Sequence, residues 1–149
     1  MNFNNYTIKA QEAIQKASEI AAGNQQQAIE PAHIFKALLN VDENVITHLL
    51  KKLNANFNYI STEVDKIVAG LPKVSGSNIY LSNAAANILQ KAQSYLKEFN
   101  DEYVSIEHLL LGFLSSSDKI GSILKDQGIN EKDVKFAIKE LRGNNRVTD

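Results

Sequence analysis

Three histidines are the residues of this chain whose chemistry most readily suggests a metal site. His33, His48 and His108 are far apart, and no two of them have the i, i+4 spacing that would place both on one face of a helix. The chain also has no cysteine, another common ligand of zinc. We therefore expect no metal site. His33 and His108 occupy equivalent positions of a repeat described below, which predicts a shared packing or capping role.

Three acidic residues, Asp101, Glu102 and Glu107, have a spacing that would suit paired carboxylates in acid–base catalysis. A solvated loop, followed by an acid near the positive end of a helix, explains the same pattern without catalysis. The sequence also lacks the glycine-rich phosphate loops, the His-Glu-x-x-His pair and the Gly-x-Ser-x-Gly elbow of common enzymes. We expect a chain that is not an enzyme and that holds no cofactor.

The composition is that of a small protein with one core. Of the 149 residues, 44% are hydrophobic and 22% are charged. A formal net charge of −1 argues against a dedicated surface for nucleic acid or for an anionic membrane. No apolar run approaches the roughly 20 residues of a membrane span, and no apolar stretch follows a basic start. We expect a cytoplasmic protein with neither nucleic acid nor membrane as a partner.

A duplication organises the chain. The stretch Ala13–Ala17 (AIQKA) aligns with Ile88–Ala92 (ILQKA), and Ile29–Ile34 (IEPAHI) aligns with Val104–Leu109 (VSIEHL). Both pairs have the same offset, since 88 − 13 and 104 − 29 are both 75. A constant offset across a helix and the loop after it indicates two stacked structural repeats.

Apolar residues recur every three or four positions in both repeats, which predicts amphipathic helices. Pro31 suits the first turn of the second helix, and Ser105 suits the N-cap of its counterpart. The predicted helices follow, in order, Ala10–Ala21, Ile34–Leu39, Val45–Leu53 and Ile60–Val68 in the first repeat, and Leu81–Leu96, Leu109–Leu114, Ile120–Leu124 and Val134–Leu141 in the second.

These elements predict an all-α fold in which two pseudo-symmetric four-helix repeats pack into one compact globular domain. Four short helices alone would leave their apolar faces half covered, so the repeats should share a core. Glycine, proline and small polar residues between them indicate a linker. The expected boundaries are a domain over 1–143, with repeats over about 3–71 and 79–143 and a linker over 72–78, and the start of a flexible tether over 144–149.

Several stretches resemble the Clp N-terminal domain, the all-helical module of paired repeats at the front of Clp ATPases. The similarity extends over essentially the whole chain. Three further stretches, one between the repeats, one at the end of the last helix and one after it, resemble the branch of ClpB-type disaggregases. The stretches that carry the resemblance are Tyr6–Ala13 (YTIKAQEA), Ile29–Ile34 and Val104–Gly112 (VSIEHLLLG) for the domain, and Leu71–Gly76 (LPKVSG), Ile138–Gly143 (IKELRG) and Arg146–Asp149 (RVTD) for the branch.

The resemblance implies a division of labour. In ClpB-type machines a flexible tether joins this domain to two ATPase modules, which use ATP and Mg²⁺ in a homohexamer. The hexamer threads aggregated polypeptides through a central pore and cooperates with the DnaK system under stress. This chain, monomeric by itself, would capture unfolded polypeptide or gate the pore, and would contribute no catalysis.

The resemblance also implies a set of site residues, some on the surface and some lining an apolar groove between helices. Two of the groove positions, Lys91 and His108, can be leucine in relatives, so we expect a more polar groove here. The implied residues are Thr7, Asp101 and Glu107 on the surface, and Leu89, Lys91 and Tyr95 in the groove, with His108 at its edge.

Alternatives remain open for both the residues and the function. Leu89 lies on the apolar stripe of its helix and could be a core residue, while Tyr95 could pack its ring and keep its hydroxyl wet. Thr7 could simply belong to a first helical turn, and Asp101 could cap or solvate its loop. The whole chain could instead dock a folded adaptor in a protease-linked Clp unfoldase, or be a stand-alone protein with its own partner or activity. The Leu-Pro-Lys-Val stretch favours the disaggregase.

Overall fold

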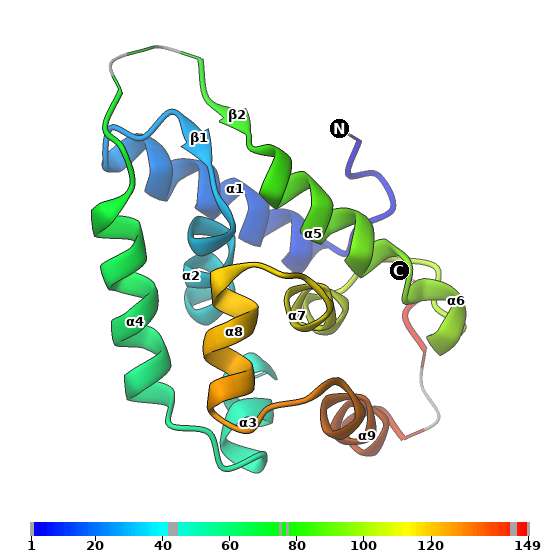
Figure 1. Ribbon diagram of the computed structural model, residues 1–149. Coiled ribbons are helices and arrows are strands. Elements are labelled where there is room, and N and C mark those ends of the chain that lie inside the picture. The colour runs from blue at the N-terminus through cyan, green and yellow to red at the C-terminus, as the bar shows by residue number, and fades with distance from the viewer. Residues whose placement is uncertain (1, 42–44, 75, 77, 144–145, 149) are drawn as a thin grey trace.

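Helices account for most of the chain (Figure 1), so the predicted all-α class is confirmed. The computed structural model describes residues 2–41, 45–74, 76, 78–143 and 146–148. The first repeat contains α1 (Ile8–Gly23), β1 (Ala28–Ile29), α2 (Pro31–Val41), α3 (Val45–Lys52) and α4 (Phe57–Gly70). The second contains β2 (Tyr80–Leu81), α5 (Asn83–Gln93), α6 (Leu96–Phe99), α7 (Ile106–Ser115), α8 (Lys119–Asp126) and α9 (Glu131–Arg142).

The helices begin at the residues that local chemistry favours. Pro31 is the first residue of α2, and Ser105 caps α7 as predicted. The prediction of one helix over Leu81–Leu96 was wrong at both ends. Leu81 is extended in β2, and Ser82 caps the helix, so α5 starts later; α5 then ends at Gln93, and the short α6 follows it.

Small residues let the first two helices of each repeat approach closely. The inner face of α1 consists largely of alanines that are fully buried against α2, namely Ala10, Ala13, Ala17 and Ala21. In the second repeat, a Cβ atom placed on Gly112 of α7 would lie 2.7 Å from the carbonyl oxygen of Ile88 on α5. The α5–α7 pair therefore requires glycine at this position, because a methyl group would overlap the facing backbone.

The two repeats exchange short extended segments. Ile29 of β1 pairs in parallel with Leu81 of β2, and Tyr6 forms the corresponding parallel bridge with Val104. The offset of 75 converts Ile29 into Val104 and Tyr6 into Leu81, so each repeat gives the other the same pair of backbone segments. This reciprocal pairing places the start of α1 beside the start of α7, which no local sequence signal predicted.

A continuous hydrophobic core includes buried side chains from both repeats. At its centre, Phe35 of α2 and Phe113 of α7 meet edge to face, with ring centroids 5.1 Å apart. Within the described part of the chain, no helix has both the length and the apolar character needed to cross a membrane. Ser75 and Ser77 of the predicted linker, and positions 144, 145 and 149 of the predicted tether, lie outside the described residues.

Candidate functional site

An open cleft of about 480 Å³ lies where α1 and α7 begin. Because the Tyr6–Val104 bridge holds the two helix starts together, the cleft draws its walls from both repeats. The N–H of Thr7 donates to the carbonyl oxygen of Val104 at 2.9 Å, and the N–H of Val104 donates to that of Asn5 at 2.8 Å. The lining residues are Thr7, Ile8, Lys9, Ser105, Ile106, Glu107 and Val147.

Two of the implied surface residues, Thr7 and Glu107, line this cleft. Thr7 is the N-cap of α1, where its hydroxyl accepts a hydrogen bond from the N–H of Ala10 at 3.1 Å. The interpretation of Thr7 as a residue at the helix start is therefore correct as far as its local bonding goes. Ile8, directly after it, is 75% exposed and is the most exposed of the large hydrophobic side chains described. The lining of the cleft thus combines apolar side chains, Ile8 among them, with the polar side chains of Thr7 and Glu107.

Glu107, which lines the cleft, belongs to a largely buried cluster of charged side chains. Nη2 of Arg142, the last residue of α9, donates to Oε2 of Glu107 at 2.6 Å. Nη1 of the same guanidinium donates to Oδ2 of Asp101 at 2.7 Å. The side chain of Asp101 is completely buried, and that of Glu107 is 14% exposed. Asp101 was expected on the surface or solvating a loop, and that expectation is wrong.

His108 completes the cluster as a neutral ring. Its Nδ1 accepts a hydrogen bond from the N–H of Ser105 at 2.8 Å, so this nitrogen carries no proton. The proton is therefore on Nε2, which donates to Oδ2 of Asp101 at 2.7 Å. The predicted capping role of His108 is confirmed, since the ring closes a capping box with Ser105. With 1% of the side chain exposed, His108 does not form the edge of an open groove.

The pKa values follow from burial and from these bonds. Burial lowers the pKa of His108, and the nearby Asp101 carboxylate offsets this only in part, so the ring stays neutral. Burial raises the pKa of Asp101, but hydrogen bonds from the Val147 N–H and from Arg142 outweigh it and keep this pKa below its ordinary value. Burial lowers the pKa of Arg142, but its bonds to Asp101 and Glu107 leave it above its ordinary value. The cluster is a fixed arrangement of charges around a neutral histidine ring.

The segment after α9 returns to this cluster. The N–H of Val147 donates to Oδ1 of Asp101 at 2.6 Å, and the N–H of Glu102 donates to the carbonyl oxygen of Val147 at 2.7 Å. Val147 also lines the cleft. The sequence suggested a flexible tether from residue 144 onward. In the structure, however, both backbone groups of Val147 are hydrogen-bonded, one to Asp101 and the other to Glu102.

The other implied groove residues lie elsewhere. Leu89 is 1% exposed and belongs to the core, as its alternative interpretation holds. Tyr95 is buried after α5; its hydroxyl donates to the carboxylate of Glu131, and Lys135 lies 5.2 Å from its ring centroid. Lys91 on α5 is partly exposed. The structure does not bring these residues to the α1–α7 cleft, and the buried side chains of Leu89 and Tyr95 cannot line an open groove.

Three residues of the site were missed by sequence reasoning: Ile8, Arg142 and Val147. Ile8 falls outside the apolar stripe of α1, and that was a usable signal, since a large apolar side chain off the stripe must be exposed. Arg142 was visible only as a basic residue in a last helical turn. No local pattern links it to Asp101, 41 residues earlier, because the contact depends on how α9 packs.

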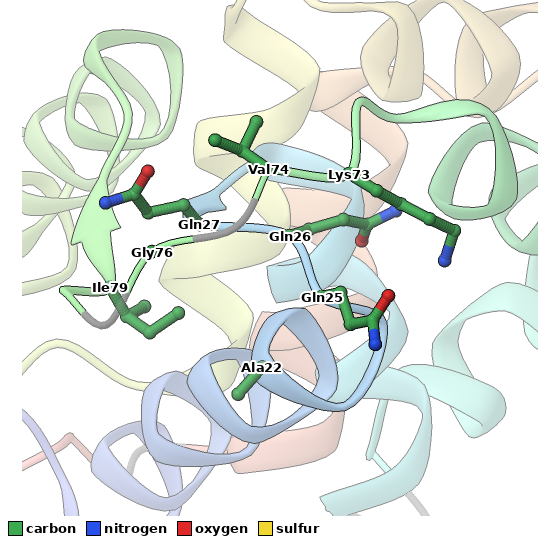
Figure 2. A pocket seen from close by; sticks show the side chains of 8 residues that line it. All are labelled: Ala22, Gln25, Gln26, Gln27, Lys73, Val74, Gly76 and Ile79. Carbon is green, nitrogen blue, oxygen red and sulfur yellow. The ribbon is translucent and has the colours of Figure 1, made fainter.

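A second cleft, of about 590 Å³, lies between the end of α1, the residues before β1 and the inter-repeat linker (Figure 2). Gln25, Gln26 and Gln27 approach it from one side, and Lys73 and Val74 of the linker from the other. Nζ of Lys73 donates to the carbonyl oxygen of Asn24 at 2.9 Å. Its described walls carry one cation and no carboxylate. The α1–α7 cleft is the better candidate because two implied residues, Thr7 and Glu107, line it.

Comparison with known proteins gives matches along almost the whole chain. The family model for the Clp repeat (R) N-terminal domain matches residues 5–127. Two chaperone proteins ClpB, from Bacteroides thetaiotaomicron and Porphyromonas gingivalis, are 48% and 43% identical to this chain over 148 residues. Each alignment covers 99% of this chain, which spans 17% of the length of these curated relatives.

Solved structures share the fold. The Hsp104 N-terminal domain from Candida albicans superposes with a TM-score of 0.84 at 24% identity, covering 98% of this chain and 97% of that one. The N-terminal domain of the ClpV1 ATPase from E. coli has a TM-score of 0.82 at 16% identity, covering 95% and 88%.

Proposed function

Because the chain belongs to the Clp repeat N-terminal domain family, we propose that it is the substrate-binding and regulatory domain of a ClpB-type disaggregase. The complete protein would be a cytoplasmic, homohexameric AAA+ ATPase that uses ATP and Mg²⁺. It would solubilise and refold aggregated proteins together with the DnaK system. The present chain would supply no catalysis and would bind unfolded polypeptide.

The observation that carries this proposal is the α1–α7 cleft, in which exposed Ile8 stands beside Thr7 and Glu107. Unfolded chains have in common only exposed apolar side chains and free backbone groups, so their receptor needs an apolar contact that accepts many sequences. Binding must also be weak enough for release to the pore. A shallow cleft with one large exposed aliphatic side chain has these properties.

Docking of a folded adaptor is the second candidate function. The Glu107 carboxylate, which lines the cleft and is held in place by Arg142, supports it, because a fixed charge selects a particular partner rather than any unfolded chain. The two functions predict different ligands for the same cleft.

A two-dimensional amide NMR titration tests the proposal. The labelled chain is titrated with a soluble, permanently unfolded protein and, separately, with the folded form of the same protein. We expect shifts at Thr7, Ile8 and Glu107 with the unfolded form only. No shifts with either form at high concentration would overturn client binding and favour the adaptor.

A pair of variants localises the binding. We expect Ile8→Ser to weaken binding of the unfolded protein about fivefold, because an exposed aliphatic side chain partly buried on binding contributes about 1 kcal/mol. Tyr59→Ser is the matched control, since Tyr59 is 45% exposed on α4, across the molecule from both termini (Figure 1). Equal weakening by both substitutions would show that binding does not depend on the cleft.

A further inference from the structure

In both repeats, backbone at or after the end of the last helix contacts a loop that lies between the first helix and α2 or α7. In the first repeat, the side-chain amide of Gln26 donates to the carbonyl oxygen of Val68, in the last turn of α4, at 2.7 Å and to that of Leu71, just after α4, at 3.3 Å. The N–H of Val74 also donates to the carbonyl oxygen of Gln25 at 3.0 Å. In the second repeat, Val147 binds to Asp101 and Glu102. The contact between this backbone and the loop is therefore a property of the repeat.

The residue that receives the segment differs between repeats in a way that suits the backbone groups presented. Gln26 and Asp101 are equivalent, since 101 − 26 is the repeat offset of 75. The backbone groups that Gln26 contacts, in Val68 and Leu71, are carbonyl oxygens, which need a donor, and Gln26 provides an amide. The second repeat presents an N–H group, which needs an acceptor, and Asp101 provides a carboxylate. In the second repeat, the Asp101 carboxylate is thus a suitable acceptor for the backbone N–H of Val147.

Asp101 and Glu102 together contact a single residue of the returning segment. Oδ1 of Asp101 accepts from the N–H of Val147, and the N–H of Glu102 donates to the carbonyl oxygen of the same residue. Binding of both backbone groups of one residue is the pattern of a hydrogen-bonded position in a β-sheet. These two bonds recognise backbone groups rather than a particular side chain. The side chain of Val147 lies against the α1–α7 cleft, so a compact apolar residue fits the bound position.

Burial makes this position one that must be filled. The Asp101 side chain is 0% exposed, and no described buried side-chain oxygen or nitrogen lacks a partner. If Val147 leaves, Oδ1 of Asp101 loses its donor, and water or another backbone N–H must replace it. An incoming extended polypeptide brings such an N–H at every residue other than proline.

We propose that Asp101 and Glu102 form a backbone-binding site for an extended polypeptide strand, which this chain's own Val147 occupies until a client strand displaces it. The inference rests on the proposed function and specifies how the client is held. The site is contiguous with the cleft that contains Ile8, so one strand can place an apolar side chain against Ile8 and a backbone amide against Asp101. This is recognition by strand addition at the level of a single residue pair.

The test compares two substitutions in the intact chain. Val147→Pro removes the N–H that Asp101 accepts, while Thr148→Pro, at an exposed neighbour, keeps that N–H and serves as the matched control. The probe is the permanently unfolded protein of the titration above. Two hydrogen bonds hold the segment, so we expect Val147→Pro to bind the probe about tenfold more tightly than the unsubstituted chain. Thr148→Pro should bind it as the unsubstituted chain does. The amide signal of Glu102 should shift when the probe binds.

Each outcome separates the inference from the proposed function. If the probe shifts Ile8 and binds all forms equally, without moving the Glu102 amide, the cleft binds clients and Val147 is only a structural anchor. That result overturns the inference alone. If none of the forms binds the probe, both the proposed function and the inference fail. Slow amide exchange at Val147 and Glu102 in the free chain is expected in addition, and rapid exchange there would show that the segment does not occupy the site.

Discussion

His33 in the first repeat and His108 in the second occupy equivalent positions and make equivalent backbone contacts. Nδ1 of His33 accepts from the N–H of Glu30 at 2.9 Å, and Nδ1 of His108 accepts from the N–H of Ser105 at 2.8 Å. Each Nε2 is 2.7 Å from an oxygen of the residue seven positions earlier, which is Gln26 in the first repeat and Asp101 in the second. Both rings are neutral and both stabilise a helix start.

The difference lies in what surrounds the partner of each histidine. Gln26 is neutral and binds two backbone carbonyl oxygens, whereas Asp101 is charged and binds Arg142 and the N–H of Val147. A buried ion pair seldom stabilises a fold more than a neutral arrangement does, because the charges must be desolvated. The first repeat shows that the fold works with the neutral arrangement. We therefore attribute the charges of the second repeat to the proposed binding of a peptide backbone at the adjacent cleft.

Among the substitutions that test this difference between the repeats, removal of Arg142 is expected to change the free energy of unfolding most. Arg142→Met should lower the free energy of unfolding by about 3–5 kcal/mol, because it leaves the buried Asp101 carboxylate without its cation. Gln26→Ala, in the neutral network, should cost about 1–3 kcal/mol through unpaired buried groups. Urea unfolding at pH 7 measures both. In an Asp101→Asn background, Arg142→Met should cost clearly less; an equal cost would show that Arg142 does not act through that charge.

Acid should destabilise the protein through its buried histidines. Burial, with a smaller contribution from Lys36, lowers the pKa of His33 from 6.5 to about 4. Between these values the unfolded chain takes up a proton that the folded chain does not, so stability falls as the pH decreases. The full shift corresponds to about 3 kcal/mol, lost by about pH 4. The pKa of His108 is also lowered, so its effect has the same sign.

The variant His33→Gln isolates the contribution of the first repeat. Glutamine at the third helical position can still accept from the N-cap N–H, but it does not titrate. Urea unfolding at several values between pH 7 and pH 4 should give a shallower loss of stability for His33→Gln than for the unsubstituted chain. If both proteins lost stability with the same pH dependence, a group other than His33 would be responsible for the loss.

The smallest expected effect concerns the close helix pair of each repeat. Gly112 of α7 and Ala37 of α2 are equivalent, and only Gly112 faces a backbone too close for a methyl group. Gly112→Ala should therefore destabilise the protein by about 1–3 kcal/mol, although alanine favours a helix. Ala37→Gly should cost about 1 kcal/mol through helix propensity, with a further loss of buried methyl contact. Stabilisation by Gly112→Ala would show that α5 and α7 can separate without penalty.

Much of the fold was predictable from the chain. The three-to-four-residue spacing of apolar side chains and the constant repeat offset indicated an all-α protein of two repeats. Pro31 and Ser105 indicated where α2 and α7 start. Thr7 and Glu107, which the resemblance implied as surface residues, line one cleft, while their role there stays a prediction. The groove assigned to Leu89 and Tyr95 was not found, because an apolar stripe shows which side of a helix is buried but not what covers it.

The sequence by itself determined the features that depend on neighbours within about four residues: helix phase, N-caps and the ring orientation of His33 and His108. The tertiary structure alone decided the reciprocal pairing of Tyr6 with Val104, the reach of Arg142 to Asp101 and the return of Val147. The physical reason is the distance along the chain between the residues that interact. A cap or an amphipathic face closes its bonds within one or two turns, whereas these contacts join segments more than 40 residues apart, and their geometry exists only once the two repeats have packed on a common core.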